Sequence, residues 1–408
     1  MKAFTWPTKR LSDVCLIKPP KSEAKNRLRE TDAVSFAPME VLGIDQKFLN
    51  ATKTRTLTEV SGSYTYFADG DVLLAKITPC FENGKLGIAQ DLVNGVGFGS
   101  SEYIVFRPSE DLDREFLYYY LSRQTFRDEG AARMSGAVGH KRVAKEFIEA
   151  YAIPIPPFNE QQRIVAILDE AFDGIATAKA NAEKNLQNAR ELFESHLQSV
   201  FTIADEKWVM TSLGAEVDLL LGFAFKSTGY TDREDGVRLL RGDNIVQGLL
   251  RWDDVKRWPE TDTDEYQKYQ LQNDDVVLAM DRPWVKAGLK HARISEVDIP
   301  CLLVQRTACL RGGVKLDSGF LMYLIGSIGF TQHILGVQTG SGVPHISGQQ
   351  IKDFSFLKPP LKQQRLIAAQ LDELKENVQR LESLYQQKLA ALAELKKSLL
   401  HEAFSGRL

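Results

Sequence analysis

The spacing of hydrophobic residues changes in kind along the chain, and the same change occurs twice. Residues 1–155 carry short alternating or continuous apolar runs between glycine, asparagine and proline, a pattern typical of strands. From Asn159 to Phe201 the apolar residues recur at helical spacing, with no proline and one glycine. Residues 208–357 return to the strand-like pattern, and Leu361 to Phe404 is again helical. The sequence therefore predicts a strand-rich domain followed by a long helix, twice over.

Local signals within the first strand-rich region predict individual elements. Residues 71–75 (DVLLA) and 102–106 (EYIVF) predict strands, and residues 116–126 (FLYYYLSRQTF) predict one helix packed on them. Residues 151–157 (YAIPIPP) must be extended, because each proline disfavours the helical region for the residue before it. We expect Asn159 to be the N-cap of the long helix that follows.

The two helical stretches are copies of each other at a fixed offset of 203 residues. Pro156–Pro157 recurs as Pro359–Pro360, and 14 of the 46 positions in 156–201 are identical to their counterparts. The strand-rich regions are related more faintly, since DVLLA at 71–75 matches DVVLA at 275–279. A shared scaffold with divergent surface loops is what two readers of two different targets require.

The second helical stretch carries a heptad pattern that predicts a coiled coil. Its a and d positions are Leu371, Leu374, Val378, Leu381, Tyr385, Leu392, Leu395 and Leu399, with one interruption at Lys388. The first stretch has alanine and Leu192 in the same register, and small side chains on one helix suit large ones on the other. We expect the two helices to pair within the chain as a rod of roughly 65 Å. The alternative, two unrelated helices that each lie on their own domain, does not explain the constant offset.

The predicted fold class is α+β. It comprises two similar mixed α/β domains separated by two long antiparallel helices that form an intramolecular coiled coil, with a pseudo-twofold internal repeat. We expect a first strand-rich domain over residues 1–155, a central long helix over 156–206, a second strand-rich domain over 207–357 and a C-terminal long helix over 358–408.

Composition changes this picture in one respect. The chain has 51 Lys and Arg against 54 Asp and Glu, a net charge of −3, whereas a nucleic-acid-binding protein is usually basic. If the protein binds DNA, its basic groups must gather on one face, or partner subunits must neutralise much of the phosphate charge. Without an apolar run of ~20 residues or a signal peptide, we expect a cytoplasmic location and no membrane partner.

Motifs of catalysis are missing from the sequence. It contains no G-x-S-x-G, H-E-x-x-H or G-x-x-x-x-G-K-[ST] pattern, and its four cysteines lack the spacing of a metal site. The glycines at 97–99 and 136–139 fit turns better than cofactor loops. We therefore expect no catalytic residue, no metal and no cofactor.

Two loops and two turns are candidates for binding. Residues 76–85 (KITPCFENGK) and 280–286 (MDRPWVK) follow matching strands and carry lysine, arginine, asparagine or tryptophan, which suit contacts to phosphates and base edges. The polar segments 140–142 and 340–345 occupy similar places near the end of each domain. For each, a solvated surface loop is the alternative.

Four segments resemble one known family. They are IPIPPFNEQQRI at 153–164, its degraded copy LKPPLKQQRL at 357–366, DVLLAKITPCFENGK at 71–85, and SGRL at the end of the chain. Together these resemble the DNA specificity subunit of type I restriction-modification systems. The second copy departs from the pattern, because its Gln-Gln-Arg run lies one residue early and lacks the glutamate.

The resemblance implies a function for the whole chain. Each domain would read one half of a bipartite DNA target through the major groove, and the helical pair would set the length of the unread spacer. Two methyltransferase subunits would dock on the chain, and motor and nuclease subunits would join the complex. Catalysis, including base flipping, would belong to those partners. The residues that we single out as DNA contacts are Lys76, Thr78, Asn83, Lys85, Ser101, His140, Lys141, Arg142, Arg241, Asn244, Arg282, Trp284, Lys286, Arg306, Ser341 and His345.

Two other hypotheses remain at this stage. A non-catalytic coiled-coil adaptor with two protein-binding domains would explain the acidic net charge. An enzyme with unrecognised catalytic groups is disfavoured by the missing motifs.

Overall fold

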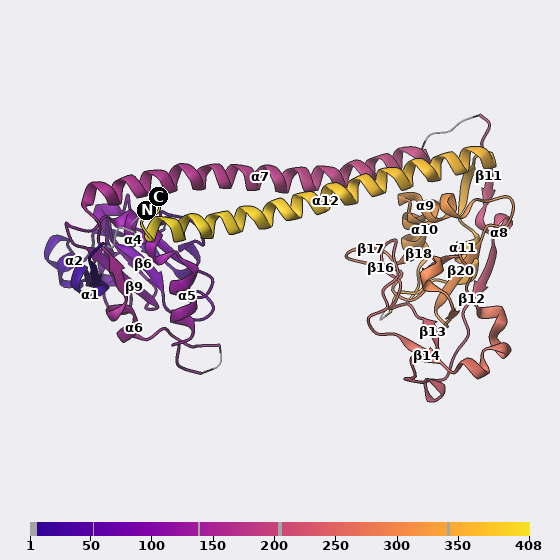
Figure 1. The fold of residues 1–408 in the computed structure, drawn as a ribbon, viewed down its shortest axis with the longest axis horizontal. Coiled ribbons are helices and arrows are strands. Elements are labelled where there is room, and N and C mark those ends of the chain that lie inside the picture. The colour runs from indigo at the N-terminus through magenta and orange to yellow at the C-terminus, as the bar shows by residue number, and fades with distance from the viewer. Residues whose placement is uncertain (1–5, 52, 138, 203–205, 341–342) are drawn as a thin grey trace. The chain divides into compact units, whose positions relative to one another are not determined.

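The chain folds into two compact units, each of which combines a strand-rich region with parts of both long helices. The computed structural model describes residues 6–51, 53–137, 139–202, 206–340 and 343–408, and Figure 1 traces the chain. Unit 1 comprises Met1–Glu183 with Gln386–Leu408, and unit 2 comprises Lys184–Tyr385. The helices α7 (Phe158–Thr202) and α12 (Leu361–Phe404) each begin in one unit and end in the other.

Unit 1 is built on two four-stranded sheets. The first has the order β2 (Cys15–Ile17), β9 (Tyr103–Pro108), β6 (Val72–Ala75), β7 (Leu86–Ile88), and the second β4 (Lys53–Thr56), β3 (Ala33–Ala37), β8 (Val96–Gly99), β5 (Thr65–Ala68). A short pair, β1 (Thr8–Arg10) with β10 (Ala152–Pro154), closes the region. Its helices are α1 (Leu11–Val14), α2 (Ser22–Arg27), α3 (Leu57–Val60), α4 (Arg114–Leu121), α5 (Gln124–Ala131) and α6 (Lys145–Ala150).

Unit 2 repeats this plan. One sheet has the order β12 (Asp218–Leu221), β20 (Thr307–Arg311), β15 (Val276–Ala279), β18 (His291–Arg293), and another β14 (Lys256–Trp258), β13 (Val237–Leu240), β19 (Cys301–Leu303). The short pairs are β11 (Val209–Ser212) with β21 (Ser355–Lys358), and β16 (Trp284–Val285) with β17 (Gly288–Leu289). The helices are α8 (Leu213–Glu216), α9 (Ser318–Gly326), α10 (Ile328–Val337) and α11 (Gly348–Lys352).

Matching strands hold matching places in the two units. Both β6 and β15 lie inside their sheets, and each is fully buried along its length, as a continuous apolar run predicts. The pairs β3–β8 and β13–β19 are both parallel. The expected α+β chain, with two similar domains, two long helices and an internal repeat, is therefore confirmed.

Two local predictions were wrong. The segment 116–126 forms two helices, α4 and α5, because the chain turns extended at Arg123 and the Ser122 hydroxyl bonds the Tyr119 carbonyl at the end of α4. Helix α7 begins at Phe158, so Asn159 lies within the first turn and is not the N-cap. The Pro157 carbonyl accepts the amides of Glu160 and Gln161 there.

The long helices lie side by side and antiparallel within each unit (Figure 1). In unit 1 the Lys396 ammonium lies 5.2 Å from the Phe172 ring centroid, and in unit 2 Arg190 pairs with Glu382 at 2.5 Å. Ala182 is buried in the seam, as its size predicts. Three expected seam leucines are nevertheless exposed, because a two-helix pair covers only one side of each helix; they are Leu192, Leu381 and Leu395.

A buried glutamine fixes the start of each long helix to its domain. The Gln161 amide accepts the Asp113 N–H at 2.8 Å and donates to the Asp111 and Pro156 carbonyls. Gln364 makes the corresponding three bonds to Asp317, Lys315 and Pro359. The one-residue shift of the Gln-Gln-Arg run therefore preserves this contact. Gln364, the second glutamine of its run, occupies the same place as Gln161, the first glutamine of the other run.

A tyrosine–aspartate bond reinforces each junction. The Tyr119 hydroxyl donates to Asp169, and the Tyr323 hydroxyl donates to Asp372 at 2.6 Å. Burial raises the pKa of both tyrosines, and the neighbouring carboxylate raises it further. Both hydroxyls therefore stay protonated as donors.

Over the described ranges, no single helix is both long and apolar enough to cross a membrane. The bent pair α9–α10 reaches the required length and composition only when its two helices are taken together.

Candidate nucleic-acid interface

In unit 1 the loop after β6 lies against the turn before α6. The Thr78 amide donates to the Lys141 carbonyl at 2.9 Å, and the Val143 amide donates to the Lys76 carbonyl at 2.9 Å. Ser135 and Arg142 pair across the turn through both of their backbone bonds. The structure therefore brings together candidates that the sequence separates by more than fifty residues.

Side chains connect this surface to the turn between β8 and β9. The Lys76 ammonium donates to the Ser101 carbonyl at 3.0 Å. The Arg142 guanidinium donates to both Glu102 carboxylate oxygens, from Nε and Nη2, at 2.8 Å each. These bonds are the main cause that lowers the pKa of the Glu102 carboxyl, and Lys76 adds to the effect. We call the group Lys76, Thr78, Ser101, His140, Lys141 and Arg142 the unit-1 contact surface.

The same backbone bonds form in unit 2 with different side chains. The Arg282 amide donates to the Pro344 carbonyl at 2.7 Å, and the Ile346 amide donates to the Met280 carbonyl at 2.9 Å. Thr339 and His345 form the pair that corresponds to Ser135 and Arg142. This equivalence shows which positions match, although almost no side chain is shared.

The charges of the unit-2 surface are arranged differently. Arg306 stands where unit 1 has Glu102, and its Nε lies 3.7 Å from the Asp281 carboxylate. The His345 ring lies 3.1 Å from the Thr339 hydroxyl. We call Arg282, Trp284, Lys286, Arg306 and His345 the unit-2 contact surface; Trp284 begins β16, and Lys286 follows that strand as an exposed residue.

Four further candidates lie outside these contacts. The Lys85 ammonium is held by the Met39 carbonyl at 2.8 Å, whereas Asn83 is exposed on the loop after β6. Arg241 lies by Asp254 at 3.4 Å. Asn244 is buried, and its amide bonds the Arg241 amide and the Arg251 carbonyl, so we assign it a structural role. Ser341 lies outside the described residues.

Comparison with known proteins identifies the family. A model of the type I restriction modification DNA specificity domain matches residues 4–187. The chain is 30% identical over 434 aligned residues to the EcoAI specificity subunit of Escherichia coli, covering 84% of this chain and 73% of that protein. The chain belongs to the specificity subunits of type I restriction enzymes.

Other members and solved structures agree with this assignment. The MjaVIII specificity subunit of Methanocaldococcus jannaschii is 25% identical, over 73% of this chain and 71% of that protein. The HsdS subunit from Thermoanaerobacter tengcongensis has a TM-score of 0.67 at 19% identity, over 99% of this chain and 98% of that chain. A chain from a study of type I R-M complex assembly has a TM-score of 0.79 at 19% identity, over 99% of both chains. At these identities the structures show a common fold.

Two charged residues of this specificity subunit, Glu102 and Lys290, carry no signal in the sequence that marks them as part of these surfaces. Glu102 pairs with Arg142 across 40 residues, and no local pattern signals that pairing. Lys290 lies near Arg282 and Asp281, and burial is the main cause that lowers its pKa, with Arg282 adding to the effect. Only the fold places both residues at the contact surfaces.

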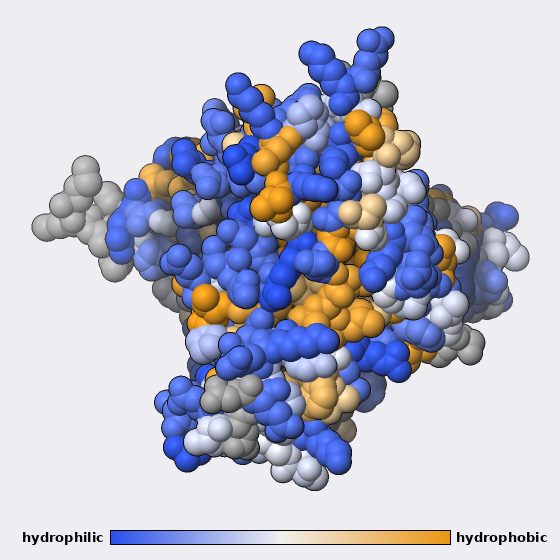
Figure 2. Space-filling model, turned by 90° about the vertical axis from the view of Figure 1, so that its right-hand side faces the viewer, coloured by the Kyte–Doolittle hydropathy of each residue, from blue (hydrophilic) through white to orange (hydrophobic). Residues whose placement is uncertain are grey.

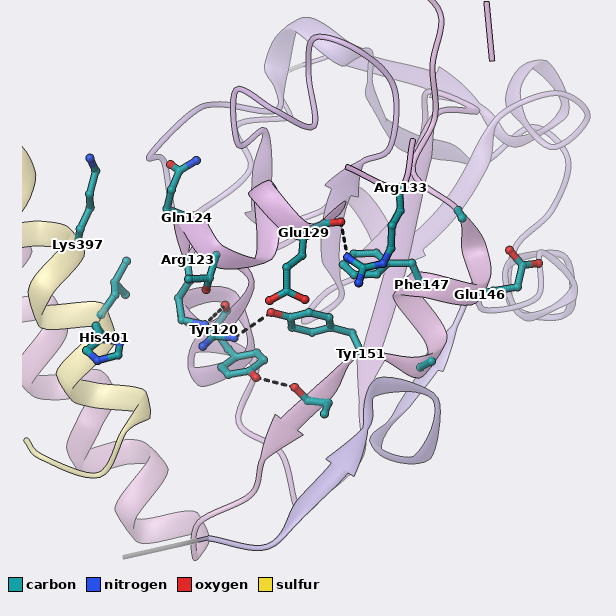
Figure 3. Close-up of a pocket in the computed structure, with 15 residues that line it drawn as sticks. Tyr120, Arg123, Gln124, Glu129, Arg133, Glu146, Phe147, Tyr151, Lys397 and His401 are labelled. Atoms are coloured by element: carbon teal, nitrogen blue, oxygen red, sulfur yellow. Dashed lines mark hydrogen bonds between the residues drawn. The ribbon is translucent and has the colours of Figure 1, made fainter. Parts of the chain in front are cut away.

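A large cavity is lined by residues other than those of the two contact surfaces. It measures about 1040 Å³ and is lined by α5, α6 and the end of α12 (Figure 3). Arg123 stacks on the Tyr120 ring at 3.6 Å, and Arg133 lies 5.2 Å from the Phe147 ring. Both arginines also donate to carbonyls of their own segment, so they act in packing around this cavity.

Three of the four cysteines are buried thiols, and the described residues form no metal site. No group of three or more His, Cys, Asp or Glu among them could hold a metal ion. Burial raises the pKa of the Cys15 and Cys301 thiols to about 12 and also raises that of Cys309. These thiols are therefore protonated and unreactive at neutral pH.

Proposed function

We propose that this specificity subunit locates DNA for a type I assembly, and that each strand-rich domain reads one half of a bipartite target. The domains are residues 1–155 and 207–357. One observation carries the proposal: each unit presents a loop and a turn joined by the same backbone bonds, while the side chains on them differ. A constant scaffold with variable side chains is what a pair of sequence readers requires.

The proposed DNA contacts are of two kinds. Exposed cations such as Lys141 and Lys286 suit phosphates, which position a protein on the duplex. Arg142, Arg282, Arg306 and His345 carry directional donors that suit base edges in the major groove. Basic groups gathered on these loops would offset the net charge of −3.

The long helices are proposed to set the spacer between the half-sites. Helix α7 has 45 residues and α12 has 44, and both pass without a break from one unit to the other. At 1.5 Å per residue, each is roughly 65 Å long. A continuous helical pair resists bending, so the spacing of the half-sites would follow from its length.

The methyltransferase subunits are proposed to dock on apolar surface that the chain leaves open. On the helical pair Leu192 is 57% exposed. Figure 2 shows hydrophobic side chains gathered at the centre of one face, on the side where Figure 1 has β11 and β12. Exposed residues of these two strands are Val209, Met210 and Leu221. Apolar patches of this kind typically mark protein–protein contacts, and the internal repeat favours two such subunits.

The catalytic residues that modify DNA are proposed to belong to the methyltransferase subunits. The buried thiols with raised pKa and the lack of a metal-binding group among the described residues fit a subunit that binds DNA without modifying it. The motor and nuclease subunits would then act through the assembled complex.

The decisive experiment is methylation mapping. The chain is co-expressed with the methyltransferase subunits of its own system, and genomic DNA is sequenced for modified bases. We expect one bipartite motif with a fixed gap. A complex that forms but modifies no defined sequence would favour the adaptor hypothesis, which the acidic net charge supports.

A further inference from the structure

Arg142 belongs to the unit-1 contact surface, and the Glu102 carboxylate holds its guanidinium in place. Its Nε and Nη2 both donate to Glu102, and its Nη1 donates to the His140 carbonyl at 3.2 Å. The side chain nevertheless remains 47% exposed. The guanidinium is therefore fixed in orientation and open to solvent at the same time.

Two donors of the Arg142 guanidinium remain free. Arginine has five N–H donors, two on each terminal nitrogen and one on Nε. The Nε donor is used, and one donor of each terminal nitrogen is used. One N–H is left on Nη1 and one on Nη2, both in the guanidinium plane, and we call this pair the free fork. A planar pair of donors matches two acceptors that lie in one plane.

We propose that Glu102 holds Arg142 so that its free fork reads a guanine in the half-site contacted by unit 1. The inference rests on the proposed function and adds a base and a positioning residue to it. Guanine offers O6 and N7 as paired acceptors in the major groove, and a bidentate arginine is their commonest partner. Glu102 spares the arginine the entropic cost of ordering its long side chain when DNA binds.

A phosphate is the other partner that an arginine fork fits, and the local charge argues against it. Arg142 and Glu102 form a neutral pair, and the unpaired positive charge of this surface belongs to Lys76 and Lys141. A phosphate beside Arg142 would also approach the Glu102 carboxylate, whereas guanine acceptors are uncharged and need only directed donors. Lys141, exposed and next in the chain, is the better phosphate contact.

Unit 2 lacks this arrangement. His345 takes the place of Arg142, and Arg306 takes the place of Glu102. Arg306 meets Asp281 through a single 3.7 Å contact, without the two-bond geometry of unit 1. The guanine contact made by a carboxylate-held arginine therefore belongs to the half-site of unit 1.

The test uses the complete complex of this chain with its methyltransferase subunits. The wild-type target is first mapped, and binding is then measured to duplexes with each base pair of the target changed, over a range of salt concentrations. The variants are Arg142→Ala, Arg142→Lys and Glu102→Gln, with Lys141→Ala as the matched control from the same turn. Thermal unfolding checks that every variant is folded.

With Arg142→Ala, we expect discrimination at one G·C pair of one half-site to fall about tenfold or more, with an unchanged salt dependence. Arg142→Lys lacks the planar fork and should lose most of the same discrimination. Glu102→Gln should weaken discrimination at that same base pair. Lys141→Ala should instead weaken binding to all sequences equally and reduce the salt slope by about one.

Two results overturn the inference while leaving the proposed function intact. One is a uniform loss with a reduced salt slope in Arg142→Ala, which would make Arg142 a phosphate contact. The other is an altered preference at an A·T pair or in the half-site assigned to unit 2. If the wild-type complex shows no sequence preference at all, both the proposed function and this inference fail.

Discussion

At the scale of single residues, the junction between domain and helix depends on one buried amide. Replacing Gln161 with alanine removes three hydrogen bonds and leaves the part-buried Asp113 N–H without this partner. We expect the free energy of unfolding to fall by about 2–4 kcal/mol. Urea denaturation of the chain measures this loss, and Gln162→Ala, at the adjacent exposed position, is the control. Equal stability of the two variants would contradict the assignment.

A half-buried histidine, His291, gives the chain a predictable response to acid. Burial is the main cause that lowers the pKa of His291 to about 4, and Lys375 lowers it further, although the ring bonds the Leu289 carbonyl. An ordinary histidine titrates near 6.5. The unfolded chain therefore takes up this proton first, so the stability due to neutral His291 is complete above pH 6.5 and is lost as the pH falls toward 4.

In the wild-type chain the free energy of unfolding should fall between pH 7.5 and pH 5. We expect this fall to be about 2 kcal/mol smaller in His291→Gln. Denaturation curves at the two pH values measure it. His196→Gln, at an exposed position on α7, should leave the loss as it is in the wild-type chain. An unchanged pH response in His291→Gln would show that another group controls it.

Single residues also mark the limit of prediction from the sequence. The basic candidates could be proposed from the sequence, because lysine, arginine and histidine after a strand favour a contact loop, and their contact with DNA stays a prediction. The pairing of Glu102 with Arg142 was not, because it depends on how β9 and the turn before α6 come together. Asn244 was predicted to contact DNA but is buried in the fold, and the sequence alone does not distinguish a buried asparagine from an exposed one.

At the scale of elements, the long helices were the most predictable part of the fold. Leu361–Phe404 matches α12 at both ends, because the proline pair before it and the unbroken helical spacing fix the helix. The break between α4 and α5 was not predictable, since all of 116–126 has helical spacing and the turn at Arg123 depends on packing. The heptad pattern predicted that the two long helices pair. It did not predict that Leu381 and Leu395 are exposed, because their burial depends on the number of helices in the bundle.

One glycine weakens α7 without serving any contact. Gly174 is exposed in the helix interior, and an added Cβ would meet no atom within 4 Å. We expect Gly174→Ala to stabilise the chain by about 0.5–1 kcal/mol, because glycine loses more backbone entropy in a helix. Urea denaturation measures it.

Gly97 in β8 is the contrasting control. An added Cβ there would lie 2.2 Å from the Phe67 ring, so Gly97→Ala should destabilise by about 1–3 kcal/mol. A destabilised Gly174→Ala variant would mean that its helix face packs against something in solution.

At the scale of the whole molecule, the two readers should be separable. Exchanging residues 208–357 for the equivalent domain of another specificity subunit should change one half of the target and leave the other half and the gap as they were. Methylation mapping of the hybrid complex reads both halves at once. A change in both halves would contradict independent reading.

The spacer should follow the helices. Removing one heptad from α7 together with the heptad that faces it on α12 shortens the pair by about 10 Å, or roughly three base pairs. We expect methylation mapping to find the same half-sites with a shorter gap, or binding to be abolished. An unchanged gap would show that the helices do not set it.

The division of the chain into units has a consequence for its synthesis. Residues 184–385 are contiguous, so unit 2 has all its parts before residues 386–408 are synthesised. Unit 1 must wait for residues 386–408, because Phe404 packs on Phe116 and Tyr120, and Leu400 and Ala403 are buried in the same core. The strand-rich region of unit 1 is thus translated before unit 2 but completed after it, and until then a nascent chain exposes that apolar surface to chaperones and proteases.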